Sequence, residues 1–258
     1  MSGQRTRTAL VAGGSSGIGL ATAARLARDG MRVVITGRDS RRLLAAATAL
    51  QSEGIEVLTA EMDTTSPDCS AVVAGIAADH GLDILVNCVG SAPAGTFDQV
   101  PEEAWLPAFD TKVVGAVRTM RGAVPHMLSA NYGRIVNVAG SAGREPDSWM
   151  AVAGAANAAL MTMTKAASSQ LAADGITVNA VCPGPVHTGR WDGLVQTYAS
   201  AWRVADTEAR LRLEARIPRG VPASAHEVAS LIHYLVSDEA GHITGTAVTI
   251  DGGQSQSI

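Results

Sequence analysis

Gly13-Gly14-Ser15-Ser16-Gly17-Ile18-Gly19 is the stretch of this chain that decides its fold. It follows a short apolar run at Thr8–Ala12 and opens a segment of helical spacing at Ile18–Arg28. A glycine-rich turn between a buried strand and a helix is typical of a dinucleotide-binding βαβ unit.

The glycines of this turn have separate tasks. Gly13 permits the tight turn, Gly17 lets the backbone approach a pyrophosphate, and Gly19 lets the helix pack closely on the strand. The N–H groups and the positive end of the helix dipole then face the phosphates. An ordinary glycine-rich turn is the alternative, and the strand before it and the helix after it disfavour that interpretation.

Short apolar runs alternate with helical patterns along the rest of the chain. We expect strands at Thr8–Ala12, Arg32–Thr36, Ile55–Ala60, Asp83–Asn87, Arg134–Val138, Thr177–Val181 and Ala247–Ile250. We expect helices at Ile18–Arg28, Arg41–Ser52, Pro67–Asp79, Glu102–Leu128, Val152–Ala173 and His226–Ser237. This order predicts an α/β fold: a doubly wound parallel seven-stranded sheet, or Rossmann fold, with helices on both faces.

We expect one domain over residues 1–258, because neither a repeat nor a low-complexity linker divides the sequence. The segment at 189–220 has no strand pattern. It carries Trp191, Tyr198 and Trp202 and predicts a helical lobe that covers a substrate.

The composition excludes several classes of function. A net charge of −4 provides no broad basic field for nucleic acid, and 47% hydrophobic residues indicate a folded protein. No apolar run is long enough for a membrane span, and no signal peptide is read. Three scattered cysteines and no paired ligand motif predict no disulfide framework, no metal and a reduced, cytoplasmic location.

Further motifs follow later strands, and together with the glycine turn they resemble the short-chain dehydrogenase/reductase family over residues 5–253. They are Asn87-Cys88-Val89-Gly90, Pro183-Gly184-Pro185-Val186-His187-Thr188 and Asp251-Gly252-Gly253. The resemblance implies that Asp63 contacts adenine and that Asn87 and Gly90 lie along the cofactor. It also implies that Pro183, Gly184 and Thr188 form the nicotinamide segment, with Thr188 holding the carboxamide.

The resemblance also predicts the cofactor. At the end of the second strand, Gly37-Arg38 stands where an NAD-selective member would carry an acidic residue. Arg38 can pair with a ribose 2′-phosphate, which favours NADP(H) over NAD. The alternative is that Arg38 is only a solvated residue at the entry of the next helix.

The four catalytic positions of the family differ in this chain. The serine position falls on Gly140, with Ser141 one step later, and the tyrosine position falls on Ala153. The lysine position falls on Asn157, and the asparagine position falls on Lys112. This pattern predicts an atypical member that lacks the Ser-Tyr-Lys residues, either with a rebuilt site or with a retired one.

The reciprocal exchange of lysine and asparagine favours a rebuilt site. Lys112 and Lys165 are the only lysines of the chain. We hypothesise that Lys112 stabilises an oxyanion or relays a proton, that Asn157 orients it, and that Ser141 contributes a hydroxyl. The alternative is that Lys112 extends to solvent or binds a backbone carbonyl.

The loop after the fifth strand offers substrate-side candidates: Ser141, Glu145, Asp147, Ser148 and Trp149. Glu145 or Asp147 could donate a proton if buried, and His187 could face the pocket. If the aromatic residues at 191, 198 and 202 form a lid and not part of the core, the substrate is bulky and apolar.

These observations leave three functions open. The first is an NADP(H)-dependent oxidoreductase acting on a bulky apolar carbonyl or related small molecule. The second is a catalytically silent dinucleotide-binding subunit or sensor, and the third is a non-redox cyclase, lyase or isomerase. The resemblance further implies a homo-oligomer, either a dimer or a tetramer, paired through its long fourth and fifth helices and its C-terminal strand.

Overall fold

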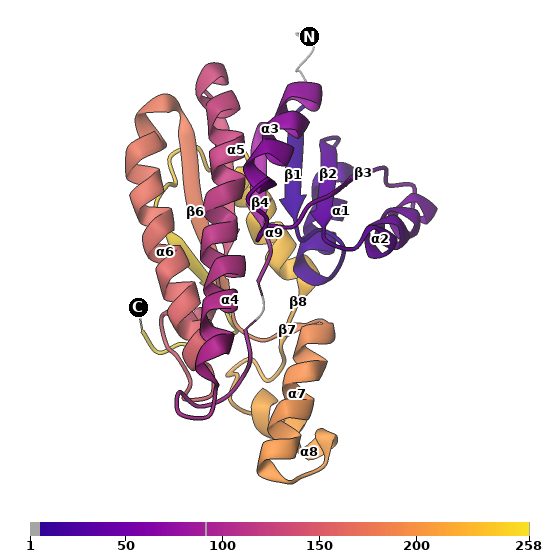
Figure 1. Ribbon diagram of the computed structural model, residues 1–258. Coiled ribbons are helices and arrows are strands. Elements are labelled where there is room, and N and C mark those ends of the chain that lie inside the picture. Colours follow the sequence, from indigo (N-terminus) through magenta and orange to yellow (C-terminus); the bar gives the residue numbers. More distant parts are fainter. Residues whose placement is uncertain (1–5, 91, 258) are drawn as a thin grey trace.

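A parallel sheet forms the centre of the molecule in the computed structural model, which describes residues 6–90 and 92–257. Its order is β3-β2-β1-β4-β5-β6-β9 (Figure 1). The strands are β1 (Thr8–Ala12), β2 (Arg32–Gly37), β3 (Leu58–Glu61), β4 (Ile84–Asn87), β5 (Gly133–Val138), β6 (Ile176–Pro183) and β9 (Ala247–Ile250). The predicted seven-stranded doubly wound sheet is confirmed. The third strand begins at Leu58 and not at Ile55.

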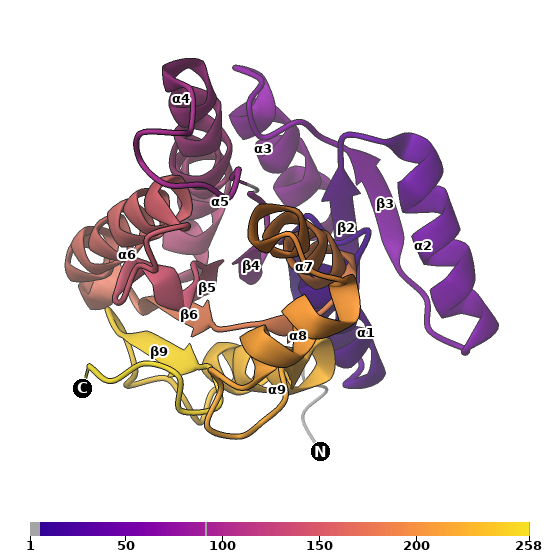
Figure 2. The ribbon, with the colours of Figure 1, turned by 90° about the horizontal axis from the view of Figure 1, so that it is seen from below.

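Helices cover both faces of the sheet (Figure 2). One face packs against α1 (Gly17–Arg28), α2 (Ser40–Ser52) and α9 (Ala225–Val236), through side chains such as Leu26, Leu43 and Ile232. The other face packs against α3 (Cys69–His80), α5 (Gly115–Ala130) and α6 (Ala151–Leu171), through Val73, Met127 and Leu171. The central strands β1, β4, β5 and β6 are buried along their whole length because helices cover both faces.

The long helix expected over Glu102–Leu128 is interrupted. A 3₁₀ turn at Glu102–Ala104 and α4 (Trp105–Phe109) lead into a π-helical turn at Asp110–Val114, which precedes α5. The Thr111 hydroxyl donates to the carbonyl of Pro107 at 2.8 Å, and this side-chain bond competes with the regular backbone ladder. Lys112 lies within the resulting π turn.

A close contact holds this turn against the sheet. A Cβ at Gly115 would lie 2.9 Å from Cβ of Thr64, so only glycine fits there without a shift. Arg118 donates through Nη1 to the carbonyl of Thr64 at 3.0 Å and to Oδ1 of Asp110 at 2.8 Å. The guanidinium therefore ties the start of the π turn to the exit of β3.

Two short strands and two helices lie beyond the carboxyl ends of the sheet. β7 (Val186–His187) pairs in parallel with β8 (Ala223–Ser224), a pair that sequence patterning did not predict. Between them come α7 (Gly189–Trp202) and α8 (Asp206–Glu214), which extend below the sheet in Figure 1 and cross its carboxyl edge in Figure 2. The order of elements thus places a helical cover over the edge where α/β proteins bind ligands.

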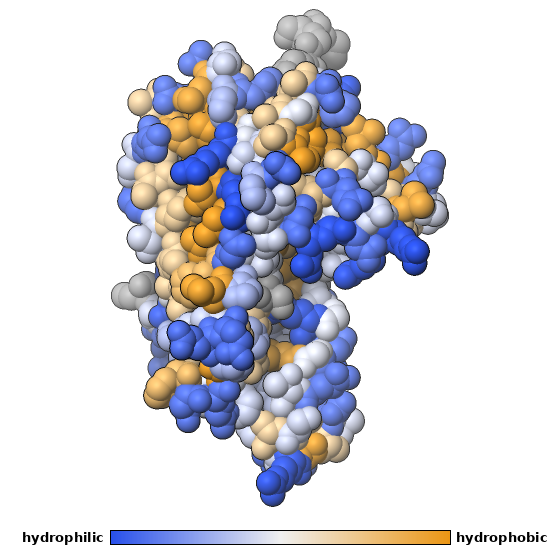
Figure 3. All heavy atoms as spheres, viewed as in Figure 1, coloured by the Kyte–Doolittle hydropathy of each residue, from blue (hydrophilic) through white to orange (hydrophobic). Residues whose placement is uncertain are grey.

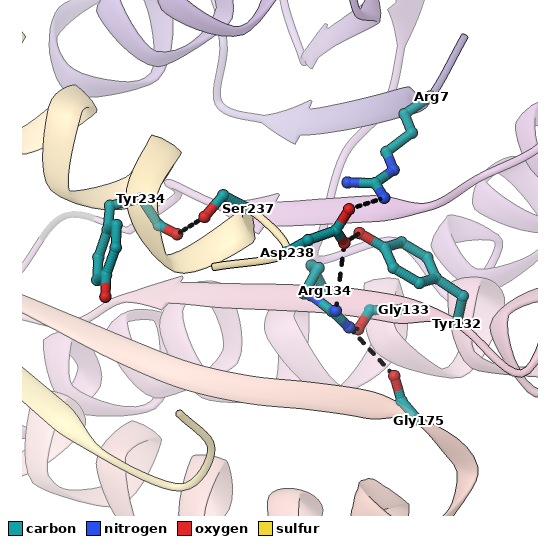
Figure 4. A network of polar contacts seen from close by, with 8 residues as sticks. All are labelled: Arg7, Tyr132, Gly133, Arg134, Gly175, Tyr234, Ser237 and Asp238. Atoms are coloured by element: carbon teal, nitrogen blue, oxygen red, sulfur yellow. Dashed lines mark hydrogen bonds and ion pairs between the residues drawn. The ribbon is translucent and has the colours of Figure 1, made fainter. Parts of the chain in front are cut away.

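The opposite end of the sheet carries a polar cluster around Asp238 (Figure 4). Asp238 accepts hydrogen bonds from Arg7 at 2.5 Å and from the Tyr132 hydroxyl at 3.3 Å, and it lies 3.7 Å from Nη2 of Arg134. Both guanidinium groups also stack over the Tyr132 ring, at 4.6 and 4.3 Å from its centroid. The cluster joins the segment after α9 to the chain near β1 and β5, far from the carboxyl edge.

Candidate functional site

The glycine turn between β1 and α1 has the geometry of a phosphate cradle. Gly13 and Gly17 have positive φ angles of 79° and 54°. A Cβ at Gly19 would lie 2.2 Å from the carbonyl oxygen of Gly13, so the helix approaches the strand as closely as a glycine allows. The N–H groups of Gly13 and Gly14 both bind the carbonyl of Thr36, at 2.9 and 3.1 Å, which fixes the turn against β2.

The N-terminus of α1 opens toward the segment after β7. Ser16 is the N-cap residue, and its side chain makes no capping hydrogen bond. A Cβ at Gly17 would lie 3.3 Å from Cγ2 of Thr188, so the start of α7 lies directly across from the turn. Backbone N–H groups at a helix N-terminus, free of a side-chain cap, fit a phosphate anion.

Arg38 and Asp63 follow two neighbouring strands of the sheet. Arg38 is exposed immediately after β2, and Asp63 is partly buried after β3. Asp63 accepts hydrogen bonds from the backbone N–H and the hydroxyl of Thr65, at 2.9 and 2.8 Å, and the backbone bond is the main cause of its lowered pKa. The charge of Arg38 also lowers this pKa.

Asn87 belongs to a buried chain of polar groups beneath the site. Its Nδ2 donates to Oδ1 of Asn137 at 2.9 Å, and its Oδ1 accepts from the Thr119 hydroxyl at 2.7 Å. Asn137 in turn donates to Thr164 at 2.9 Å. Because these groups are buried and satisfied, they fix α5 and α6 against β4 and β5.

Lys112 extends from the π turn to the carboxyl ends of β4 and β5. A Cβ at Gly90 would lie 2.5 Å from Cδ of Lys112, so glycine leaves room for the lysine stem. Nζ donates to the carbonyls of Val138 and Ala139, at 2.8 and 3.0 Å. An ammonium has three donors, so one N–H remains for another acceptor.

The surroundings of Lys112 change its acidity. Burial away from water lowers the pKa of Lys112 to about 8, and the positive charge of Arg190 lowers it further. The nearby thiols of Cys88 and Cys182 oppose this effect. Burial raises the pKa of Cys88 to about 12, so this thiol is protonated at neutral pH.

Gly140 and Asn157 contact one another at the end of β5 that the Lys112 ammonium also reaches. A Cβ at Gly140 would lie 2.7 Å from Nδ2 of Asn157, which is buried on α6. Lys112 donates to the two carbonyls immediately before Gly140. The side chains of Lys112 and Asn157 therefore reach the same end of β5. Ala153 is buried one turn earlier on α6, and Ser141 is partly buried in the 3₁₀ turn at Ser141–Gly143.

The nicotinamide segment packs against the C-terminal part of the chain. Pro183 ends β6, and Gly184 donates its N–H to the carbonyl of Ile250 at 3.0 Å. A Cβ at Gly184 would lie 2.7 Å from Cβ of Asp251. Thr188 follows as the N-cap of α7, at the entrance of the cleft.

The two loop carboxylates, Asp147 and Glu145, bind groups from distant parts of the chain. Asp147 accepts from the Arg216 guanidinium and from the Tyr198 hydroxyl, and its pKa is lowered although burial opposes the change. Glu145 accepts from the backbone N–H groups of Gln256 and Ser257, at 2.6 and 2.7 Å. These contacts join the loop after β5 to the segment after α8 and to the C-terminal segment. A proton-donating role for Glu145 or Asp147 stays a prediction.

The aromatic residues of the lobe mostly form its own core. Trp191 and Tyr198 are 3% and 2% exposed and pack against Ala209 and Leu213 of α8. Tyr198 also stacks with Trp149 and Trp202, at ring-centroid distances of 5.2 and 4.9 Å. The stack fastens the lobe to the loop before α6.

His187 and Tyr198 also lie near the carboxyl end of the sheet. His187 is exposed in β7 and does not face a buried pocket. The pKa of Tyr198 is raised to about 12, first by burial and then by the charge of Asp147, which makes its hydroxyl a weak acid. Sequence reasoning missed Arg190 and Arg216; the position of Arg190, two residues after Thr188, was the available signal.

Within residues 6–90 and 92–257, no group of three or more potential ligands could hold a metal ion. No helix in the same ranges is long and apolar enough to cross a membrane.

The short chain dehydrogenase family matches residues 7–199. The chain belongs to this family. A putative ketoacyl reductase of Streptomyces coelicolor is 35% identical over 257 residues, which cover 98% of each protein.

Two solved structures share this fold along their whole length. A tryptophan variant of the actinorhodin polyketide ketoreductase with NADPH has a TM-score of 0.94 and 34% identity, with 100% of both chains covered. YwfH, an NADPH-dependent reductase involved in bacilysin biosynthesis, has a TM-score of 0.91 and 31% identity, covering 98% of this chain and 100% of its own. The chain is thus an oxidoreductase-family member whose relatives include ketoacyl reductases.

Proposed function

We propose that this protein is an NADP(H)-dependent reductase of ketoacyl-like carbonyl compounds in which Lys112 performs the task of the family's tyrosine. The cofactor is NADP(H), since one solved relative contains NADPH and another is an NADPH-dependent reductase. The cradle at Gly13–Gly19 accommodates its pyrophosphate, because side chains at these glycines would fill the space. Arg38, Asp63, Asn87, Gly90 and Thr188 are the other residues that we expect to hold it.

The position of the Lys112 ammonium carries the proposal. When bound, NADPH supplies a hydride to the carbonyl carbon, and the oxygen then needs a positive charge and a proton. Lys112 has one donor left after its two carbonyl bonds, and a pKa of about 8 makes it a usable acid near neutral pH. Asn157 and Gly140 shape the space beside it, and water can return the proton to Lys112.

A matched pair of variants tests this role. Lys112→Met removes the acid, and Lys165→Met removes the only other lysine, which is exposed on α6. We expect Lys112→Met to lose at least about a hundredfold in the rate of NADPH oxidation with bulky ketones, and Lys165→Met to keep it. Unchanged turnover in Lys112→Met contradicts the proposal.

The same assay separates the other two functions. Binding of NADPH without oxidation across a panel of bulky ketones and quinones supports a silent binding subunit. Product formation without NADPH supports a non-redox enzyme on the same fold.

The size of the substrate is inferred from a hollow and not from the lobe aromatics, which pack in the lobe's own core. An apolar hollow of about 610 Å³ lies beside Asp147 and Ser148. It supports a bulky apolar substrate body. Ketones of increasing ring number test this: KM should fall as apolar surface increases.

We also propose a cytoplasmic homo-oligomer. Figure 3 shows apolar side chains along α5 and α6, and Leu106, Val114 and Leu128 are 78%, 40% and 39% exposed on the α4–α5 segment. Contact between copies would cover them. Light scattering distinguishes monomer, dimer and tetramer.

A further inference from the structure

Two carboxylates, one residue apart, hold the loop after β5 from two different parts of the chain. Glu145 accepts hydrogen bonds from the backbone N–H groups of Gln256 and Ser257, at 2.6 and 2.7 Å. Asp147 accepts a hydrogen bond from the guanidinium of Arg216, in the segment after α8. The loop is therefore fixed at 145 by the segment after β9 and at 147 by the segment that follows the helical lobe.

Pro146 lies between these two anchors and forms part of the wall of the apolar hollow. A Cβ at Gly154 of α6 would lie 2.9 Å from Cβ of Pro146 and 2.9 Å from the carbonyl oxygen of Ala142, so the loop contacts the helix closely. Ala142 and Gly143 line the same hollow. Because a proline ring fixes its own φ, the place of this wall depends on where the residues beside Pro146 are anchored.

The segment that reaches Glu145 is itself fixed. Asp251 is buried, and its carboxylate accepts hydrogen bonds from the backbone N–H groups of Gly253 and Ser255, at 3.0 and 2.7 Å. Asp251 also contacts the nicotinamide segment, since a Cβ at Gly184 would lie 2.7 Å from its Cβ. The donors to Glu145 thus come from a folded segment that packs on the floor of the candidate site.

The contact with Glu145 uses both carboxylate oxygens. Oε2 accepts from Gln256 and Oε1 accepts from Ser257, and such charge-assisted bonds are stronger than bonds between neutral groups. Arg144, the preceding residue, donates to the carbonyl of Ala247 in β9 at 2.8 Å. Two consecutive residues of the loop are therefore bound to the C-terminal part of the chain, and the side-chain amide of a glutamine at 145 would offer only one acceptor atom.

We propose that Glu145 is a positioning residue, which sets the wall of the hollow at Pro146 through its bonds to Gln256 and Ser257 and so determines the size of substrate that fits. This inference rests on the proposed reductase function with a bulky apolar substrate. Without the anchor at 145, the loop is held at Asp147 and the wall is free to move. A bulky substrate then loses apolar contact, whereas a small ketone that does not reach the wall is unaffected.

Three variants test the role of the carboxylate. Glu145→Ala removes both acceptors, Glu145→Gln keeps one, and Glu239→Ala removes an exposed carboxylate after α9 as a control. We expect KM for 2-acetylnaphthalene to rise about tenfold or more in Glu145→Ala and by less in Glu145→Gln. The value of kcat, the affinity for NADPH and KM for 2-butanone should not change, and the control should match the unaltered protein.

Proline substitutions test the other end of the contact, because proline has no N–H to donate. Ser257→Pro removes one donor and should raise KM for 2-acetylnaphthalene in the same direction as Glu145→Gln. Ser257→Pro added to Glu145→Ala should have no further effect, since the bond is already absent. Strictly additive effects overturn the inference, as does a Glu145→Ala protein that loses kcat for small and bulky ketones alike.

Calorimetric titration of both ketones into the protein with NADP⁺ separates this inference from the proposed function, because it requires no turnover. If the preference for the bulky ketone depends on Glu145 but NADPH is never oxidised, the reductase function fails and the positioning role stands. If NADPH is oxidised and Glu145→Ala keeps the full preference, the reductase stands and the positioning role fails.

Discussion

Nδ2 of Asn157 occupies the space that a side chain at Gly140 would need, since a Cβ there would lie 2.7 Å from it. The two positions are therefore matched to one another. A serine at 140 together with the present asparagine would overlap unless one of the two side chains shifted.

The close contact between Gly140 and Asn157 predicts that substitutions at the two positions have non-additive effects on stability. Gly140→Ala should reduce the free energy of unfolding by about 1–3 kcal/mol because the added methyl group meets Asn157. Asn157→Ala in the same chain should recover most of that loss. Urea denaturation of the two single variants and the double variant gives the coupling energy, and strictly additive effects would show that the contact is unimportant.

The low pKa of Lys112 predicts how the stability depends on pH. The pKa is about 8 in the folded protein and 10.5 in an unfolded reference, so the unfolded chain binds more protons between these values. The stability of the protein relative to Lys112→Met should then increase as pH rises from about 8 to 10, and it should be flat below 8. Thermal unfolding of both proteins across this range measures the difference; a constant difference would mean that Lys112 keeps an ordinary pKa.

The same group sets a pH limit on catalysis. If Lys112 donates the proton, kcat/KM for NADPH-dependent reduction should fall as pH rises through about 8. If Lys112 had an ordinary lysine pKa, kcat/KM would stay constant up to a much higher pH. Any residual activity of Lys112→Met should lack this descending limb.

The phosphate cradle can be tested with two glycines at opposite ends of α1. Gly17 has a φ of 54° and lies opposite Thr188, whereas Gly30 has a φ of 81° and nothing within 4 Å of an added Cβ. Both alanine variants strain the backbone, but only Gly17→Ala fills the cleft. We expect Gly17→Ala to weaken NADPH binding about tenfold or more and Gly30→Ala to leave it unchanged, as measured by NADPH fluorescence. Equal loss in both variants would point to general destabilisation.

The cluster in Figure 4 predicts a change in stability without a change in activity. The pKa of Asp238 is lowered chiefly by its bond from Arg7, so its stabilising effect is present above its usual pKa and is lost as pH falls through the lowered value. Asp238→Asn should lower stability at pH 7 by up to about 1 kcal/mol, since the pair is largely exposed. Glu239→Gln, on the exposed neighbour, should have no effect on the melting temperature, and the two proteins should oxidise NADPH equally well.

Periodicity predicted the sheet because the strands are apolar on both faces and the helices between them are regular. It did not predict the break at Asp110–Val114, which depends on the Thr111 hydroxyl and on the close approach of Gly115 to Thr64. The short β7–β8 pair was missed because two-residue strands have no periodicity.

The candidate site was predicted in part, for a similar reason. The glycine turn and the exchange of Lys112 with Asn157 are visible in the sequence because flanking motifs fix their positions. The partners of Glu145 and Asp147 lie 111 and 69 residues away, at Gln256 and Arg216, and no local pattern reveals them.

The π turn at Asp110–Val114 sets the direction in which the Lys112 side chain leaves the helix, and therefore where its ammonium lies. A π turn contains one residue more than an α turn needs, and each residue of a helix rotates the side chains by about 100°. Removing a single residue between 110 and 114 would restore a continuous helix and turn Lys112 away from β5, with every functional side chain still present. The proposed role of Lys112 can therefore be gained or lost when one residue is inserted or deleted in this turn. A comparison of residue types alone would overlook such a change.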